Sequence, residues 1–155
     1  MHLTLLAAGN RMPRWVEEGY AEYAQRLSGE FRLELKEIAL GQRNAGATHQ
    51  AIAREGERMT AALPPSCYVV ALQVEGKAMT SEQLAQFLAA RARDGRDVAF
   101  CIGGPDGLAL DIDRRADYRW SLSNLTLPHG LARIVVAEAL YRGVSILRNH
   151  PYHRA

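Results

Sequence analysis

The chain has 155 residues, of which 48% are hydrophobic and 23% are charged. This length and composition are typical of one globular domain with its own core, and no apolar run approaches the roughly 20 residues that a membrane-spanning helix needs. The formal net charge of +2 is too small to identify a nucleic-acid partner on its own. We therefore expect a single domain over residues 1–155 and no membrane contact. Because no basic segment precedes the short apolar N-terminus, we also expect no export signal and a cytoplasmic protein.

The first half of the chain alternates strand patterns with helix patterns. Residues 3–8 form a short apolar run that predicts a buried strand, and Pro13 opens a helical pattern. Residues 31–36 alternate apolar and charged side chains, which indicates a strand with one wet face at a sheet edge. A polar loop at 41–46 then precedes a second helical pattern at 48–63, which a pair of prolines ends.

The second half predicts a parallel sheet. Residues 67–74 and 98–102 are almost wholly apolar, as strands are when helices cover both faces of a sheet. A capping-box pattern at 80–83 predicts the start of the helix between them. Four further elements are predicted: a short helix at about 111–116, a short strand at 120–122, an irregular segment at 125–128 and a last helix at about 130–147. This alternation predicts an α/β fold with a mainly parallel sheet flanked by helices.

Cysteine and histidine usage argues against disulfide and metal chemistry. Cys67 and Cys101 lie in apolar strand patterns, where a free cysteine is typically a small buried hydrophobe in a reducing compartment. His150 and His153 have no cysteine or carboxylate nearby at metal-ligand spacing. We therefore expect free buried thiols and no metal site.

Two segments follow predicted strands, where open α/β sheets bind their ligands. In the loop at 103–107, three glycines allow backbone N–H groups to approach a ligand closely, although a tight turn without a ligand is equally consistent. The loop has neither the lysine of a P-loop nor the glycine spacing of a dinucleotide site. Residues 121–130 mix small hydroxyl side chains with leucines, which predicts a loop inside the protein. A bound purine or a neighbouring subunit would satisfy its backbone polar groups.

The C-terminal part of the chain is the basic part. Residues 118–155 carry five arginines and one acid, Glu138, for a net charge of +4, which leaves −2 for residues 1–117. Arginine suits phosphate recognition, although a GC-rich genome produces the same bias. Glu138 and Arg142 are four residues apart and share a helix face, as a surface ion pair or as a partly buried functional pair. Residues 149–154 combine groups that stack on bases and hold phosphate, and a frayed terminus is the alternative.

Four motifs in this order resemble one family. They are 102–107 (IGGPDG), 121–129 (SLSNLTLPH), 138–142 (EALYR) and 149–153 (NHPYH). Together they resemble the SPOUT-class family of large-subunit ribosomal RNA pseudouridine N3-methyltransferases, and the resemblance covers essentially the whole chain. It implies an α/β fold with a C-terminal trefoil knot, a rare exception to the rule against knots. It also implies S-adenosyl-L-methionine (SAM) as methyl donor, the assembled ribosome as substrate, and a homodimer in which the tail of one subunit completes the site of the other.

The resemblance also assigns roles to residues. The donor-binding set that it implies is Leu72, Gln73, Gly103, Gly104, Ser123, Asn124, Leu125, Thr126, Leu127 and Pro128. The imide nitrogen of the base is a poor nucleophile until its proton leaves, so the site needs a proton acceptor and groups that hold the anionic base or its phosphate. The candidates are His129, Glu138 and His153 as acceptors, with Arg142, Tyr152 and Arg154 holding the substrate. Two alternatives stay open: a non-catalytic ribosome-associated RNA-binding factor, and a small phosphate-binding metabolic enzyme.

Overall fold

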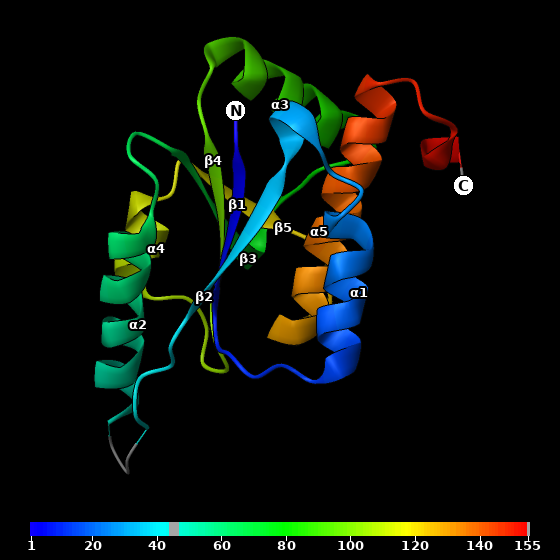
Figure 1. Cartoon of the computed structure of the whole chain (residues 1–155). Coiled ribbons are helices and arrows are strands. Elements are labelled where there is room, and N and C mark those ends of the chain that lie inside the picture. Colours follow the sequence, from blue (N-terminus) through cyan, green and yellow to red (C-terminus); the bar gives the residue numbers. More distant parts are fainter. Residues whose placement is uncertain (44–46, 155) are drawn as a thin grey trace.

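Five parallel strands form one sheet, in the order β2-β1-β4-β3-β5 (Figure 1). The structure is a computed structural model and describes residues 1–43 and 47–154. The strands are β1 Leu3–Ala8, β2 Leu33–Ile38, β3 Tyr68–Ala78, β4 Val98–Ile102 and β5 Tyr118–Ser121. The α-helices are α1 Arg14–Ala24, α2 Thr48–Ala62, α3 Ser81–Asp94, α4 Leu110–Arg115 and α5 His129–Leu147, and short 3-10 turns occur at Gly29–Phe31 and Pro151–Arg154.

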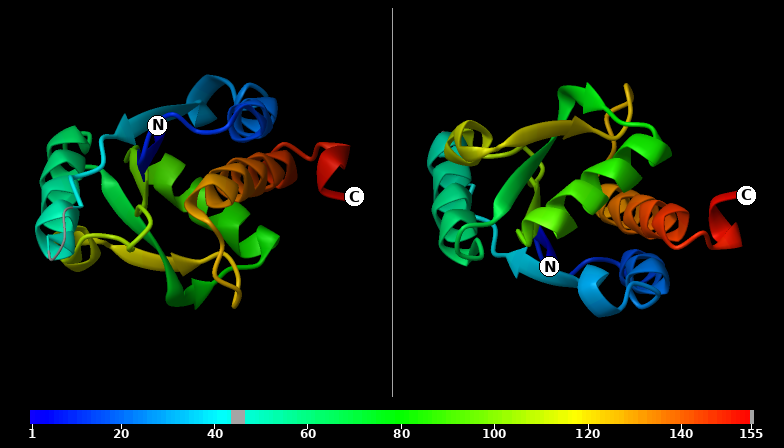
Figure 2. Two further views of the ribbon diagram at one scale, coloured as in Figure 1. Left: turned by 90° about the horizontal axis from the view of Figure 1, so that it is seen from below. Right: turned by 90° about the horizontal axis from the view of Figure 1, so that it is seen from above.

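Helices cover both faces of the sheet, which confirms the predicted α/β architecture. Figure 2 shows α2 and α4 on one face and α1, α3 and α5 on the other. Side chains of β1 alternate between the two layers. Leu3 and Leu5 pack in the cluster beneath α5, whereas Leu6 packs in the cluster beneath α2. All three are fully buried, and each contributes about 1.5–3 kcal/mol by leaving water.

The N-terminal predictions are confirmed with one boundary error. β1 has the predicted bounds, and α1 begins directly after Pro13, which stands at the N-cap. β2 is an edge strand, as its alternating pattern predicts. The prediction that this strand includes Phe31 is wrong, because Phe31 belongs to the 3-10 turn and is buried there. Of the polar loop predicted at 41–46, residues 44–46 lie outside the described residues.

In the second half of the chain, β3 is longer than its apolar pattern predicts. It continues to Ala78 because its pairing with β5 resumes after a register shift, with Leu72 and Lys77 both opposite Trp120. α3 has the predicted capping box: the Thr80 hydroxyl accepts from Gln83 N at 3.0 Å, and Thr80 N donates to the Gln83 side chain at 2.8 Å. β5 begins at Tyr118, two residues before its predicted start.

Cys67 and Cys101 are buried free thiols, as predicted. Burial raises the pKa of both and takes that of Cys101 to about 12, so these thiols are unreactive. Among residues 1–43 and 47–154, no group of three or more His, Cys, Asp or Glu side chains is placed to hold a metal ion. Within the same residues, none of the helices combines the length and apolar character that crossing a membrane requires.

Candidate functional site

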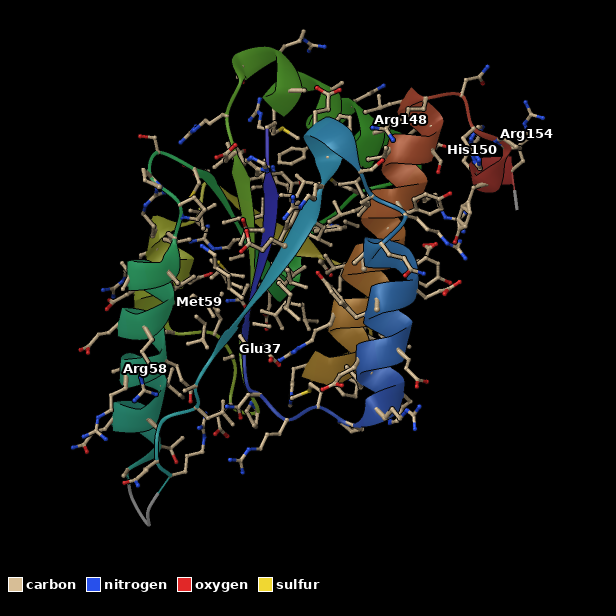
Figure 3. The ribbon with its side chains drawn as sticks, viewed as in Figure 1. Glu37, Arg58, Met59, Arg148, His150 and Arg154 are labelled. Atoms are coloured by element: carbon tan, nitrogen blue, oxygen red, sulfur yellow. The ribbon has the colours of Figure 1, made fainter. Side chains whose placement is uncertain are left out.

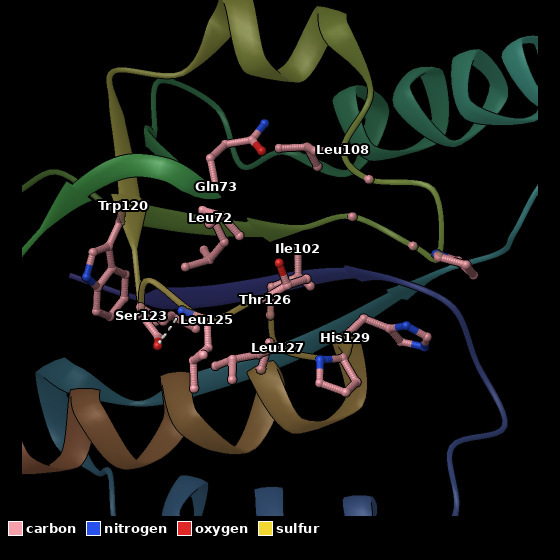
Figure 4. Close-up of a pocket in the computed structure, with 18 residues that line it drawn as sticks. Leu72, Gln73, Ile102, Leu108, Trp120, Ser123, Leu125, Thr126, Leu127 and His129 are labelled. Carbon is pink, nitrogen blue, oxygen red and sulfur yellow. Dashed lines mark hydrogen bonds between the residues drawn. The ribbon is translucent and has the colours of Figure 1, made fainter.

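A pocket of about 520 Å³ lies at the carboxyl end of β4, beside the middle of β3 (Figure 4). Three segments line it: β3 at 72–74, where its pairing with β5 shifts register, the glycine loop after β4, and the segment between β5 and α5. This is where an open α/β sheet binds ligands, and the volume is in the range of small-molecule sites. Its lining combines apolar side chains with a few polar groups, Gln73, Ser123 and Thr126 among them.

The glycine loop closes on itself beside the pocket. Gly107 N donates to the carbonyl of Gly104 at 3.0 Å, and Gly107 has a φ of +93°, which favours glycine. A Cβ on Gly103 would lie 2.4 Å from the Gly107 carbonyl carbon, so only glycine fits there. The loop is therefore a tight turn that also forms one wall of the pocket. The tight turn is observed, whereas the approach of its backbone to a ligand stays a prediction.

The segment at 122–128 forms the opposite wall. Ser123 Oγ accepts from Leu125 N at 3.0 Å (Figure 4). Ser121 Oγ donates to the Ser123 carbonyl at 3.0 Å. The prediction that this segment lies inside the protein is wrong for a single chain. Leu125 is 73% exposed, because it faces the open mouth of the pocket and has no core beneath it.

The pocket contains most residues of the set implied by the resemblance. Asn124 is exposed and does not line it; the nine that do are Leu72, Gln73, Gly103, Gly104, Ser123, Leu125, Thr126, Leu127 and Pro128. Gln73 is oriented by Asp113, whose Oδ1 accepts from Gln73 Nε2 at 3.1 Å. Arg119 holds that carboxylate and lowers the pKa of Asp113 below its usual range. The ionised Asp113 carboxylate therefore fixes the orientation of the Gln73 amide.

His129 is the one candidate proton acceptor in the pocket lining. Burial, and secondarily the Arg133 guanidinium, lower the pKa of His129 below its ordinary value. The imidazole is therefore neutral near pH 7 and able to accept a proton. Arg133 is 2% exposed and donates to the Gly9 carbonyl at 2.8 Å and to Glu37 Oε2 at 2.8 Å (Figure 3 labels Glu37).

The C-terminal residues fold back against α5. Glu138 accepts from Arg142 Nη2 at 3.1 Å and from Tyr152 Oη at 3.1 Å. The Arg142 guanidinium lies over the Tyr152 ring at 4.9 Å, and Tyr141 meets the same ring edge-on at 4.7 Å. Burial and Glu138 together raise the pKa of Tyr152 to about 12. The described tail is therefore ordered around Glu138, which contradicts the frayed-terminus alternative.

The tail and the pocket lie at different places along α5. His129 begins the helix, whereas Glu138 and Arg142 lie 9 and 13 residues further along it, about 14 and 20 Å at 1.5 Å per residue, and Tyr152 folds back onto Glu138. Figure 3 shows His150 and Arg154 beside the C-terminal end of α5. One chain therefore places His129 in the pocket but keeps Glu138, Arg142, Tyr152, His153 and Arg154 away from it.

Several residues of the site escaped the sequence analysis. Trp120, Leu122, Leu108 and Pro105 line the pocket but were not assigned to the donor site, although Pro105 and Leu122 lie within two of the four motifs. Arg133 had a clearer signal, because a lone arginine between Ala132 and Ile134 in an apolar helix is expected to be buried with partners.

Comparisons with known proteins agree with this geometry. The family described as "Predicted SPOUT methyltransferase" matches residues 1–153. Three curated relatives are named "Ribosomal RNA large subunit methyltransferase H". The protein of Nitrosomonas eutropha is 49% identical over 155 residues, that of Xanthomonas campestris pv. campestris 52% over 156, and that of Alkalilimnicola ehrlichii 53% over 156. Each match covers 100% of this chain and 100% of the relative.

Solved structures share the fold at much lower identity. A putative methylase family protein from Neisseria gonorrhoeae has a TM-score of 0.53 at 16% identity, with 90% of this chain and 81% of that chain covered. A probable methylase family protein from Haemophilus influenzae has a TM-score of 0.52 at 14% identity, with 97% and 69% covered. The chain belongs to the SPOUT methyltransferase family.

Proposed function

We propose that the chain is a SAM-dependent methyltransferase that methylates N3 of a pseudouridine in large-subunit ribosomal RNA. One observation carries the proposal: a pocket of ligand size between the middle of β3 and the end of β4, in a chain about half identical over its full length to curated large-subunit ribosomal RNA methyltransferases. The proposal includes the C-terminal trefoil knot that the resemblance implies, with the chain after β5 passing through the earlier part of the fold.

The pocket fits a methyl donor with a flat aromatic base and a polar amino-acid group. Leu72 and Leu127 offer apolar surface, while Gln73, Ser123 and Thr126 offer hydrogen-bonding groups. Gly104 lines the pocket without a side chain, which lets its backbone approach the ligand closely. When bound, SAM supplies an electrophilic methyl group on a sulfonium sulfur. We assign donor binding to the nine lining residues named above and leave exposed Asn124 at the rim.

His129 is the proton acceptor in this proposal. As the methyl group bonds to N3 and its bond to sulfur breaks, the N3 proton must leave, and the neutral His129 imidazole faces the pocket to take it. Glu138 acts by organising the tail, while Arg142 and Arg154 hold the phosphate or the anionic base and Tyr152 stacks on it. His153 is the second candidate acceptor. Its ring lies in the tail, where Nδ1 is buried without a partner among the described residues.

A homodimer brings these two sets together. In one chain the tail packs against Glu138, 9 residues along α5 from His129, and none of the tail residues lines the pocket. Leu131 and Val135 on α5 are only half-buried although they are apolar, which supports a second copy packed against this helix. We propose that the tail of one subunit reaches the pocket of the other.

Mixed dimers test the shared site. A Gly103→Val chain lacks a usable pocket and an Arg142→Ala chain lacks the tail arrangement, so each homodimer should be inactive or nearly so. Co-expression of the two, with differently tagged chains purified together, should restore activity, because one of the two composite sites contains no substitution. Mixed dimers as inactive as the parents would contradict a site shared between subunits.

Labelled SAM tests the activity itself. The protein is incubated with labelled SAM and with assembled ribosomes, separate subunits or naked ribosomal RNA, and the labelled nucleotide is mapped. We expect label on N3 of a large-subunit pseudouridine and strongest labelling of assembled ribosomes, which fits a cytoplasmic protein. A non-catalytic RNA-binding factor would show salt-dependent RNA binding but no SAM affinity by calorimetry. A phosphate-binding metabolic enzyme would show neither.

A further inference from the structure

A buried carboxylate lies behind the glycine turn, outside the pocket. Glu55 on α2 has a side chain only 4% exposed and accepts three hydrogen bonds from residues after β2. Its Oε2 accepts from Gly41 N at 2.9 Å and from Arg43 Nη1 at 2.7 Å, and its Oε1 accepts from Arg43 Nη2 at 3.3 Å. The bidentate contact to Glu55 fixes the plane of the guanidinium.

The remaining edge of that guanidinium points to the glycine turn. Arg43 Nε donates to Asp106 Oδ2 at 2.6 Å, so one side chain joins α2 to the tip of the turn. Asp106 occupies the third position of the turn that Gly104 begins and Gly107 closes. Residues 103–105 and 107 all line the pocket, whereas Asp106 does not. Its carboxylate faces Arg43 on the outer side of the turn.

Close packing leaves the turn little freedom to move toward α2. A Cβ on Gly104 would lie 3.4 Å from Glu55 Oε1 and 3.0 Å from Leu40 Cδ2. Hydrogen bonding to Glu55 first, and to Asp106 second, raises the pKa of Arg43, so its guanidinium is charged near neutral pH. The contact with Asp106 is partly shielded from water, since Arg43 is 22% and Asp106 is 42% exposed.

We propose that Arg43, held by Glu55, is a positioning residue that sets the affinity of the pocket for SAM through Asp106. The inference rests on the proposed function, because it assumes that SAM occupies the pocket. Arg43 touches neither the pocket nor the reacting atoms. It holds the turn whose Gly103 and Gly104 form the wall against the donor, and misplacement of such a wall weakens ligand binding even when the substitution is remote.

Calorimetric titration of SAM into folded variants tests this proposal without RNA. Arg43→Met and Asp106→Asn should each raise the Kd about tenfold, the expected effect of losing one charged hydrogen bond that orders the turn. The double variant should bind no more weakly than the weaker single variant, because both changes break the same contact. At saturating SAM, kcat of Asp106→Asn should stay within about twofold of wild type while KM for SAM rises.

Arg96→Met is the matched control. Arg96 donates to the carbonyl groups of Ser66 at 3.1 Å and Cys67 at 3.3 Å, at the amino ends of β3 and β4 and away from the pocket. Its loss should lower the melting temperature and leave the Kd for SAM unchanged. Asp106→Asn keeps the test valid if Arg43→Met does not fold, because Asp106 lies on an exposed turn.

Three outcomes overturn the inference, and only the first of them also overturns the proposed function. Wild-type protein that binds no SAM would overturn the proposed function and this inference with it. Wild-type affinity retained in folded Arg43→Met or Asp106→Asn would overturn this inference alone, as would additive losses in the double variant.

Discussion

The start of α5 and its C-terminal half differ in how much of a site a single chain supplies. At the start, where His129 lies, one chain provides all three walls of a pocket, and Arg133 is buried on the same helix. Further along the helix, Glu138 gathers Arg142 and Tyr152 into an ordered cluster whose residues do not line that pocket. Under the proposed function, one chain therefore preassembles donor binding, whereas substrate binding needs a second subunit.

The largest expected effect is at the pocket. Gly103→Val should abolish measurable SAM binding, because a side chain there would overlap the Gly107 carbonyl and open the turn. Calorimetry measures it, and Gly95→Ala is the control. Gly95 also has a positive φ of 67°, but it caps α3, and a Cβ there meets nothing within 4 Å. Unchanged SAM binding in Gly103→Val would show that the glycine turn is not the donor wall.

His129 should give the next largest effect. His129→Gln is expected to slow methylation about hundredfold, in the range of general base catalysis, with unchanged SAM binding. The wild-type rate should fall at acid pH, below the ordinary histidine value of about 6.5, because burial lowers the pKa of His129 and protonation removes the acceptor. Rates measured across pH on assembled ribosomes check this. If His129→Gln keeps the same fall in rate at acid pH as the wild type, the proton acceptor is His153 instead.

The tail cluster should have a smaller effect of a different kind. Glu138→Gln weakens the contacts to Arg142 and Tyr152, so turnover should fall about tenfold while the Kd for SAM stays at the wild-type value. Glu18→Gln is the matched control, since Glu18 and Arg14 form a similar pair four residues apart on α1. Equal losses in both variants would mean that the tail cluster has no special role.

The smallest effect should come from a residue outside both the pocket and the tail cluster. Thr80→Ala removes the capping box of α3 and should lower the free energy of unfolding by about 1 kcal/mol, with SAM binding and methylation unchanged at temperatures where the protein is folded. Denaturant unfolding and calorimetry measure the two quantities. A change in SAM affinity here would show that general destabilisation, and not local geometry, governs the other variants.

Local patterns were enough to predict most elements. Apolar runs identified β1 and β4, alternation identified β2 as an edge strand, and the Thr80 capping box located the start of α3. These features depend on side chains within a few residues of one another, so periodicity and capping rules capture them. The extension of β3 to Ala78 escaped prediction because it depends on pairing with Trp120, far along the chain.

For the site too, the sequence predicted one part and only the tertiary structure shows the other. The motif order in the chain indicated the family and about half of the pocket lining, since the resemblance assigned nine of the lining residues to the donor and His129 to catalysis. Only the folded chain shows that the 122–128 segment is an open wall and that Arg43 reaches Asp106 across 63 positions. It also shows that the tail packs against α5 at Glu138, away from the pocket. Such distances follow from how helices pack on a sheet, which no local pattern encodes.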